Sequence, residues 1–103
     1  MTELVLSEVG AVVAPEREAE LVALYRELVA GPLPEGLVRT ELLHGPGGRW
    51  RVQSLWRDMA ALEAVRSAPG RPAAPALFRK VGTEPELAVY VVAVAQTGEF
   101  TLQ

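Results

Sequence analysis

Four segments of the chain carry apolar residues in patterns typical of β-strands. The first and the last are apolar at alternate and at adjacent positions, which indicates strands that are buried on both faces. The two middle segments alternate, so that Ser54 and Trp56 share one face while Gln53 and Leu55 share the other. A Gly-Pro-Gly-Gly sequence at positions 45–48 separates them and is a strong turn signal. The predicted strands are Glu3–Ala14, Leu37–His44, Arg49–Trp56 and Leu87–Ala95.

Two further segments repeat apolar residues at steps of three and four, the spacing of an amphipathic helix. The first spans Glu16–Ala30 and ends before a Gly-Pro pair, which stops helices. The second spans Met59–Ala68, where Asp58 can cap the amino terminus of the helix. Pro75–Val81 is expected to add a short helical segment, and residues 99–103 are expected to form a short fifth strand or a tail.

The order of these elements, β-α-β-β-α-β, predicts an α+β fold of the ferredoxin-like type, a four-stranded antiparallel sheet with both helices on one face. We expect a single domain over residues 1–103, with its core at 4–95 and a carboxy-terminal tail or short extra strand at 96–103. If both helices cover one face of the sheet, the other face lies open unless a partner covers it.

The composition favours such a partner. Half of the 103 residues are hydrophobic, and 22% are charged. A chain of this length buries only roughly 60–65% of its unfolded surface as a monomer, and both sides of the predicted last strand are apolar. We therefore expect a homodimer that packs sheet to sheet.

Residue usage excludes several kinds of protein. The chain has no cysteine and one histidine, His44, which excludes a disulfide scaffold, a thiolate metal site and a multi-histidine metal centre within one chain. The net charge of −3 argues against a nucleic-acid partner. The longest apolar run, Ala88–Ala95, is far shorter than the roughly 20 residues that span a membrane, and the amino terminus has no basic signal-peptide region. No glycine-rich phosphate loop follows the first strand. We expect a cytoplasmic protein without a metal or a cofactor.

The segment Arg51–Ala64, with the sequence RVQSLWRDMAALEA, resembles the strand-to-helix signature of the antibiotic biosynthesis monooxygenase (ABM) domain family. In that signature a tryptophan closes the third strand, and a helix rich in acidic residues, Ala and Leu follows. Residues 15–20, 34–37 and 90–92 resemble the start of the family's first helix, the entry to its second strand and its last strand. The resemblance covers about residues 4–95 and implies a dimeric α+β barrel. It also implies one of the family's activities, which include cofactor-independent oxidation of phenols by O₂, quinol oxygenation and haem degradation.

Two positions argue against the haem-degrading branch. In that branch a histidine on the second helix ligates iron, and the same count from Trp56 gives Val65 or Arg66 here. A valine cannot ligate iron, and an arginine stays protonated. The first-strand asparagine of that branch also has no counterpart, because Ser7 or Glu8 occupies that region.

The phenol-oxidising branch implies a pocket between the sheet and the helices, with a tryptophan, an arginine and polar strand residues around the phenol. Trp56 matches the tryptophan by motif, and Arg79 stands where the arginine is expected. The asparagine of that branch would fall near Gln53 or Ser54, and this chain contains no asparagine. The residues that we expect to bind the substrate are Tyr25, Ser54, Trp56, Phe78 and Tyr90.

Cofactor-free oxygenation needs a phenolate or an enolate that itself donates an electron to O₂, while the protein keeps the pocket dry and stabilises negative charge. Three side chains are candidate catalytic residues. His44 is the candidate base, although a histidine beside a glycine-rich turn is also typical of a solvated strand end. Trp56 can stack on an aromatic ligand and donate its N–H, or pack as core. Arg79 can neutralise a phenolate or a superoxide-like species, or lie on a solvated face.

The sequence therefore favours a homodimeric monooxygenase that oxidises a small aromatic phenol or quinol. Two alternatives stay open. One is a non-catalytic dimer of the same fold that binds a small hydrophobic ligand, and the other is a structural or regulatory dimer with a collapsed pocket.

Overall fold

The computed structural model describes residues 3–69, 72–96 and 98, and within them it has four β-strands and three α-helices. Short 3-10 turns at Pro15–Arg17 and Pro46–Gly48 precede the first helix and join the two middle strands. The elements are β1 (Val5–Val12), α1 (Glu18–Ala30), β2 (Leu37–His44), β3 (Arg49–Trp56), α2 (Met59–Ser67), α3 (Ala73–Lys80) and β4 (Glu86–Val91).

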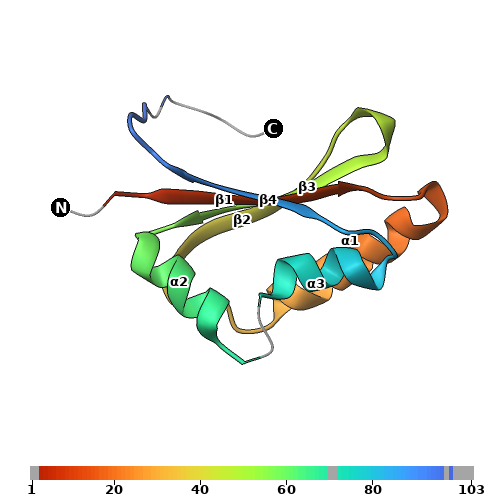
Figure 1. Ribbon diagram of the computed structural model, residues 1–103, viewed down its shortest axis with the longest axis horizontal. Coiled ribbons are helices and arrows are strands. Elements are labelled where there is room, and N and C mark those ends of the chain that lie inside the picture. The colour runs from red at the N-terminus through yellow and green to blue at the C-terminus, as the bar shows by residue number, and fades with distance from the viewer. Residues whose placement is uncertain (1–2, 70–71, 97, 99–103) are drawn as a thin grey trace.

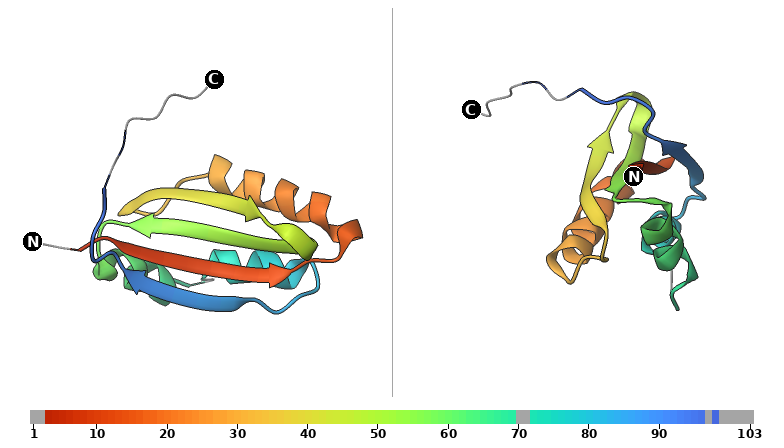
Figure 2. Two further views of the ribbon diagram at one scale, coloured as in Figure 1. Left: turned by 90° about the horizontal axis from the view of Figure 1, so that it is seen from above. Right: turned by 90° about the vertical axis from the view of Figure 1, so that its left-hand side faces the viewer.

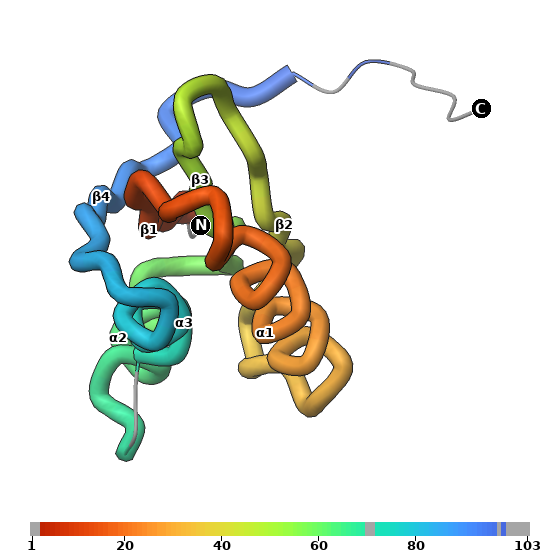
Figure 3. Tube along the Cα trace, turned by 90° about the vertical axis from the view of Figure 1, so that its right-hand side faces the viewer, coloured from red at the N-terminus to blue at the C-terminus, as the bar shows by residue number. Residues whose placement is uncertain are grey.

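The strands form one antiparallel sheet in the order β2-β3-β1-β4 (Figure 2). All three helices lie on one face of this sheet (Figure 1). In Figure 3, α1 lies below the half of the sheet that contains β2, while α2 and α3 follow one another below the other half. The ferredoxin-like α+β fold predicted from the order of the elements is confirmed.

The predicted boundaries of two strands are wrong. The last strand ends at Val91 rather than Ala95, and the first spans Val5–Val12 rather than Glu3–Ala14. β4 is an edge strand that pairs with β1, and Val91 stands opposite Val5, where β1 begins. Val92 still donates its N–H to the Leu4 carbonyl at 2.9 Å, but the strand pairing ends there, and Val94 is 90% exposed. The predicted fifth strand or tail at 99–103 lies outside the described residues.

The short helical segment expected after α2 is a complete helix. α3 begins at Ala73, two residues before the predicted Pro75, and its side chains Leu77 and Phe78 are buried. The helix contacts both α1 and β1. The structure therefore has three helices below the sheet where the pattern of apolar residues predicted two and a short segment.

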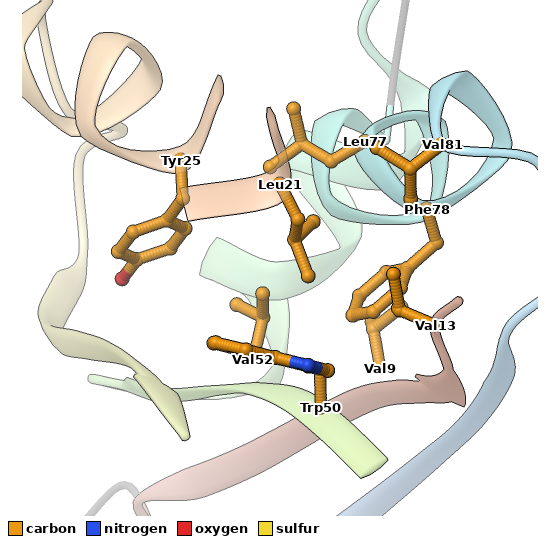
Figure 4. Packing of buried hydrophobic residues seen from close by; sticks show 9 residues of the cluster. All are labelled: Val9, Val13, Leu21, Tyr25, Trp50, Val52, Leu77, Phe78 and Val81. Atoms are coloured by element: carbon orange, nitrogen blue, oxygen red, sulfur yellow. The ribbon is translucent and has the colours of Figure 1, made fainter. Parts of the chain in front are cut away.

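The helix-facing side of the sheet carries two separate apolar clusters. The larger lies between α1, α3 and the sheet, and Leu21 and Phe78 in it are fully buried (Figure 4). The smaller lies between α2 and the sheet and contains Trp56 and Leu62. On β1, Val9 belongs to the larger cluster and Val5 to the smaller. The residue between them on the same face is a serine, so a polar level of the sheet separates the two clusters.

The opposite face of the sheet is mixed in character. Leu6 stands between Leu55 on β3 and Tyr90 on β4, which gives an apolar row at one end of this face. Further along the strands the residues are mostly polar, and Arg51 binds Glu8 at 3.1 Å. Exposed apolar side chains return near the other end of the face, at Val12 and Leu43. The apolar positions of the open face thus lie towards its ends, with a charged band between them.

Candidate functional site

A cavity of about 200 Å³ lies between the helix-facing side of the sheet and the three helices. Its deep wall consists of buried residues, among them Val52, Trp56 and Leu62. Its lining also includes exposed residues, Leu33 between α1 and β2 and Arg66 in the last turn of α2. These exposed residues mark the opening, and the helical part of the lining comes from α1, α2 and α3.

Three hydroxyl side chains form one level of the cavity wall. Ser54 on β3 stands opposite Ser7 on β1 and opposite Thr40 on β2. Side chains directly opposite one another on antiparallel strands have their Cβ atoms about 4.5–5.5 Å apart. We call Ser7, Ser54 and Thr40 the polar row. The levels on either side of it are apolar and consist of Val5, Trp56 and Leu37, and of Val9, Val52 and Leu42.

Hydrogen bonds tie the polar row to α1 and to Trp56. The Tyr25 hydroxyl donates to Thr40 Oγ1 at 2.9 Å, and Thr40 Oγ1 and Ser54 Oγ share a bond of 2.9 Å in which either atom is the donor. Trp56 Nε1 donates to Ser7 Oγ at 2.9 Å. Each of the three side chains of the polar row therefore has a hydrogen-bond partner in the protein. These bonds keep the side chains in place before any ligand binds.

The number of hydroxyl hydrogens shows what the row offers a ligand. Tyr25, Thr40 and Ser54 each have one hydroxyl hydrogen, and their two mutual bonds use two of the three. The third hydrogen, on Ser54 or Thr40 according to which one donates, is left for another acceptor. Ser7 accepts the indole hydrogen and keeps its own. The polar row thus presents hydrogen-bond donors to an oxygen atom in the cavity.

The site provides donors rather than a base. Burial raises the pKa of the Tyr25 hydroxyl above its ordinary value, so this group is neutral near pH 7 and acts as a donor. Among the described lining residues the carboxylate is that of Glu8, and it binds Arg51 across the open face of the sheet. The cation of the lining is Arg66, at the opening.

The structure brings three of the five expected substrate-binding residues to this cavity: Tyr25, Ser54 and Trp56. Phe78 packs in the larger apolar cluster, where it has no exposed surface, and it is not among the lining residues (Figure 4). Tyr90 stands opposite Leu6, so it lies on the open face of the sheet and is 53% exposed.

The structure does not bring His44, Trp56 and Arg79 together. His44 stands opposite Trp50 and Trp56 stands opposite Leu37, at the two ends of the β2–β3 ladder. Trp50 and Trp56 are six positions apart along β3, which is a distance of roughly 20 Å.

His44 and Arg79 have partners of their own. The His44 ring stacks on Trp50 with 3.9 Å between ring centroids, and its Nε2 lies 3.5 Å from the Glu18 carboxylate. Arg79 is exposed and donates to both carboxylate oxygens of Glu84, and this hydrogen bond lowers the pKa of Glu84. Neither His44 nor Arg79 lines the cavity.

Sequence reasoning missed Thr40 as a site residue and considered Ser7 and Arg66 only as positions that lack a family residue. The available signal was that each of three strands carries one hydroxyl side chain on its apolar face, with an apolar residue two positions further along the same strand. Recognising it required the register, because only the pairing of Ser7, Ser54 and Thr40 turns three separate hydroxyls into one row.

The described residues contain no group of three or more His, Cys, Asp or Glu side chains that could hold a metal ion. In the same part of the chain, the search for a membrane-crossing helix finds none of sufficient length and apolar character.

The family model described as "Antibiotic biosynthesis monooxygenase" matches residues 11–74 of the chain, which include most of the polar row, Trp56 and α2. The chain belongs to the antibiotic biosynthesis monooxygenase family. The ABM resemblance of the sequence is therefore confirmed. Among curated proteins, no sequence matches the chain significantly.

Solved structures share the fold of this chain. A variant of SnoaB, a cofactor-independent oxygenase from Streptomyces nogalater, is 25% identical with a TM-score of 0.65, and the match covers 93% of this chain and 97% of that chain. A conserved protein from Methanosarcina mazei Go1 is 20% identical with a TM-score of 0.70, over 86% of this chain and 92% of that chain. A protein of unknown function from Nitrosomonas europaea is 21% identical with a TM-score of 0.68, over 97% and 98% of the two chains.

Proposed function

We propose that this ABM-family protein is a cofactor-independent monooxygenase that oxidises a small aromatic phenol or quinol in the cavity below the sheet. The observation that carries the proposal is the polar row, which crosses an otherwise apolar wall. Apolar walls favour the transfer of an aromatic ring out of water, and the row supplies donors for a ring oxygen. SnoaB is described as a cofactor-independent oxygenase, which favours this chemistry within the family.

For a phenol with a free para position, the proposed reaction consumes one O₂. The phenolate gives one electron to O₂, and the radical pair joins at the para carbon to form a peroxide, which takes up the proton that the phenol released. Loss of the hydrogen from that carbon as a proton breaks the O–O bond. One oxygen atom stays as the new carbonyl of a quinone, and the other leaves as water, so the substrate itself is the reductant.

The side chains around the cavity would stabilise the anion on this path. The free hydrogen on Ser54 or Thr40 would donate to the phenolate oxygen, and Tyr25 would hold that pair in place from α1. Trp56, fixed by its bond to Ser7, would offer an aromatic face. Because apolar walls exclude water, each donor would stabilise negative charge more strongly than it does in solution.

The size of the cavity limits the substrate. Pockets for drug-sized ligands measure about 300–1,000 Å³, and this cavity has about 200 Å³. A compact aromatic of one or two rings suits this volume better than an extended polycyclic compound.

A non-catalytic protein that binds a small hydrophobic ligand is the second candidate. It is favoured by one observation, that the described lining residues include no histidine and that their carboxylate, Glu8, binds Arg51. An oxygenase with this lining depends on the acidity of its substrate, whereas a binding protein needs no ionisation at all.

We also infer a homodimer through the open face of the sheet. The apolar row of Leu6, Leu55 and Tyr90 supports a contact with a second copy, and the Glu8–Arg51 pairs would lie at the same interface. Light scattering should give about twice the chain mass of 11.1 kDa. Leu55→Glu should shift the mass to that of one chain, and an 11.1 kDa species in the wild type would contradict the dimer.

Oxygen uptake separates the two candidate functions. The protein, treated with a chelator and freed of flavin, is incubated with a panel of phenols, naphthols and quinols of one or two rings in an oxygen electrode. Saturable uptake that falls at least tenfold in Ser54→Ala supports the oxygenase. Saturable quenching of Trp56 fluorescence without uptake, measured in a Trp50→Phe background, supports the binding protein. If the protein shows no oxygen uptake and no quenching, both candidate functions are rejected.

A further inference from the structure

Arg66 is the cation among the described residues that line the cavity. It lies in the last turn of α2, and its side chain is 36% exposed. Its ion pair is with Glu63, one turn earlier on the same helix, at an N–O distance of 3.8 Å. A pair that is this long and this exposed contributes little free energy. The guanidinium therefore has donors to spare at the opening of the cavity.

The two polar parts of the cavity lie at different depths. The polar row lies on the sheet, where Ser54 is buried, whereas Arg66 lies at the exposed end of α2. Between them the lining is apolar, with Leu62 and Val65 on α2 itself. A ligand that satisfies both parts has an aromatic middle, an oxygen at its deep end and an anionic group at its outer end.

We propose that the preferred ligand is a small aromatic acid, whose carboxylate binds Arg66 at the opening while its phenol oxygen meets the polar row. This assignment rests on the proposed function, because it uses the same cavity. A guanidinium presents two parallel N–H donors that match the two oxygens of a carboxylate. Because the chain has a net charge of −3, a general attraction for anions does not account for such a preference.

The start of α3 also lines the cavity. Pro72, Ala73 and Ala74 line it, and the N-cap residue Pro72 supplies no side-chain cap to the helix. The first N–H groups of a helix carry partial positive charge. Like Arg66, this charge would favour a carboxylate over a neutral group in the cavity.

The test compares 6-hydroxy-2-naphthoic acid with its methyl ester, which keeps the rings and the phenol but has no charge. Binding of each is measured by calorimetry at neutral pH. We expect wild type to bind the acid roughly fivefold more tightly than the ester, which corresponds to about 1 kcal/mol. Arg66→Gln should remove this preference by weakening the acid alone. Arg66→Lys should keep part of it, because lysine retains the charge and loses the paired donors.

Two further variants sharpen the result. Glu63→Gln removes the competing carboxylate and should tighten binding of the acid without changing that of the ester. Arg26→Gln removes an arginine from α1 that does not line the cavity, and it should leave the acid-to-ester ratio unchanged. The preference should also shrink at high ionic strength, because the site is partly exposed.

The outcomes distinguish the carboxylate assignment from the cavity proposal. Equal binding of acid and ester to wild type, or an equal loss of both in Arg66→Gln, would overturn the carboxylate assignment and leave the cavity proposal standing. If neither naphthalene compound binds wild type, both proposals fail. Thermal unfolding of Arg66→Gln, compared with wild type, shows whether its folded state is intact, so that a selective loss of the acid is a property of the site.

Discussion

Tyr25 on α1 donates a hydrogen bond of 2.9 Å to Thr40 on β2, and this bond connects a helix to the polar row of the sheet. The tyrosine is buried, and its ring belongs to the larger apolar cluster (Figure 4). One side chain therefore supports the core with its ring and the candidate site with its hydroxyl. The two roles can be separated by substitution.

Tyr25→Phe keeps the ring and removes the hydroxyl. We expect it to lower the free energy of unfolding by about 1 kcal/mol, the usual net value of such a hydrogen bond. Thr40→Val should cost more, because it leaves the buried Tyr25 hydroxyl without its acceptor. The double variant should cost less than the sum of the two, as expected for partners in one network. Urea unfolding with an unchanged m-value measures all three, and additive losses would contradict the coupling.

The pKa of Tyr25 gives the protein a specific dependence on alkaline pH. Burial raises the pKa of this hydroxyl above the value near 10 of an unfolded chain. In the window above pH 10 the native state keeps the proton that the unfolded chain has lost. The free energy of unfolding therefore falls as pH rises through this window. Tyr25→Phe should flatten that part of the stability curve.

The same shift is measurable directly. In a Tyr90→Phe background, tyrosinate absorbance reports Tyr25 alone, since the chain has two tyrosines. We expect its midpoint to lie above that of the urea-unfolded protein. An identical midpoint in the two states would show that the hydroxyl is not buried in solution.

The hydrophobic pattern predicted the fold because each strand and helix has its own periodicity, which is a local property. It placed Ser54 and Trp56 on the same face of β3, and both line the cavity. The N-cap of α2 was also predicted from the local sequence. Asp58 accepts a hydrogen bond from the Ala61 N–H at 2.9 Å.

The grouping of site residues depended on information that alternation does not contain. Alternation states which face a residue occupies, whereas register states which residue of the next strand stands beside it. His44 and Trp56 lie on the same face of the sheet, but the antiparallel pairing of β2 and β3 sends them to opposite ends. The irregularity between Leu37 and Arg39 shifts the pairing further, and it sets Thr40 opposite Ser54.

His44→Gln and Ser54→Ala form a pair that tests where the chemistry takes place. His44 lies about 20 Å along the sheet from Trp56, whereas Ser54 belongs to the polar row. With any phenol or quinol that the protein oxidises, we expect Ser54→Ala to lower kcat/KM about tenfold or more. His44→Gln should change it less than twofold. The reverse ranking, with a tenfold loss in His44→Gln, would restore the imidazole as the base and contradict the site described above.

Gly36→Ala and Gly47→Ala separate a packing requirement from a backbone requirement. Both glycines have positive φ, 88° at Gly36 and 71° at Gly47, so each alanine carries a strain of about 1–2 kcal/mol. A Cβ at Gly47 meets nothing within 4 Å, whereas a Cβ at Gly36 collides with the side chain of Ala61 on α2. We expect Gly36→Ala to cost about 1–3 kcal/mol more than Gly47→Ala, the usual range for overpacking.

The position of Gly36 makes its substitution a test of the cavity as well. Its carbonyl accepts the Arg57 N–H at 2.7 Å, so the glycine cannot move freely away from α2. The helix must shift instead, and α2 carries Leu62 and Val65 of the cavity wall. Gly36→Ala should therefore weaken ligand binding, and adding Ala61→Gly should recover part of both the stability and the affinity. If Gly36→Ala and Gly47→Ala have equal effects in urea unfolding and in ligand titration, the contact between the β2 entry and α2 is not present in solution.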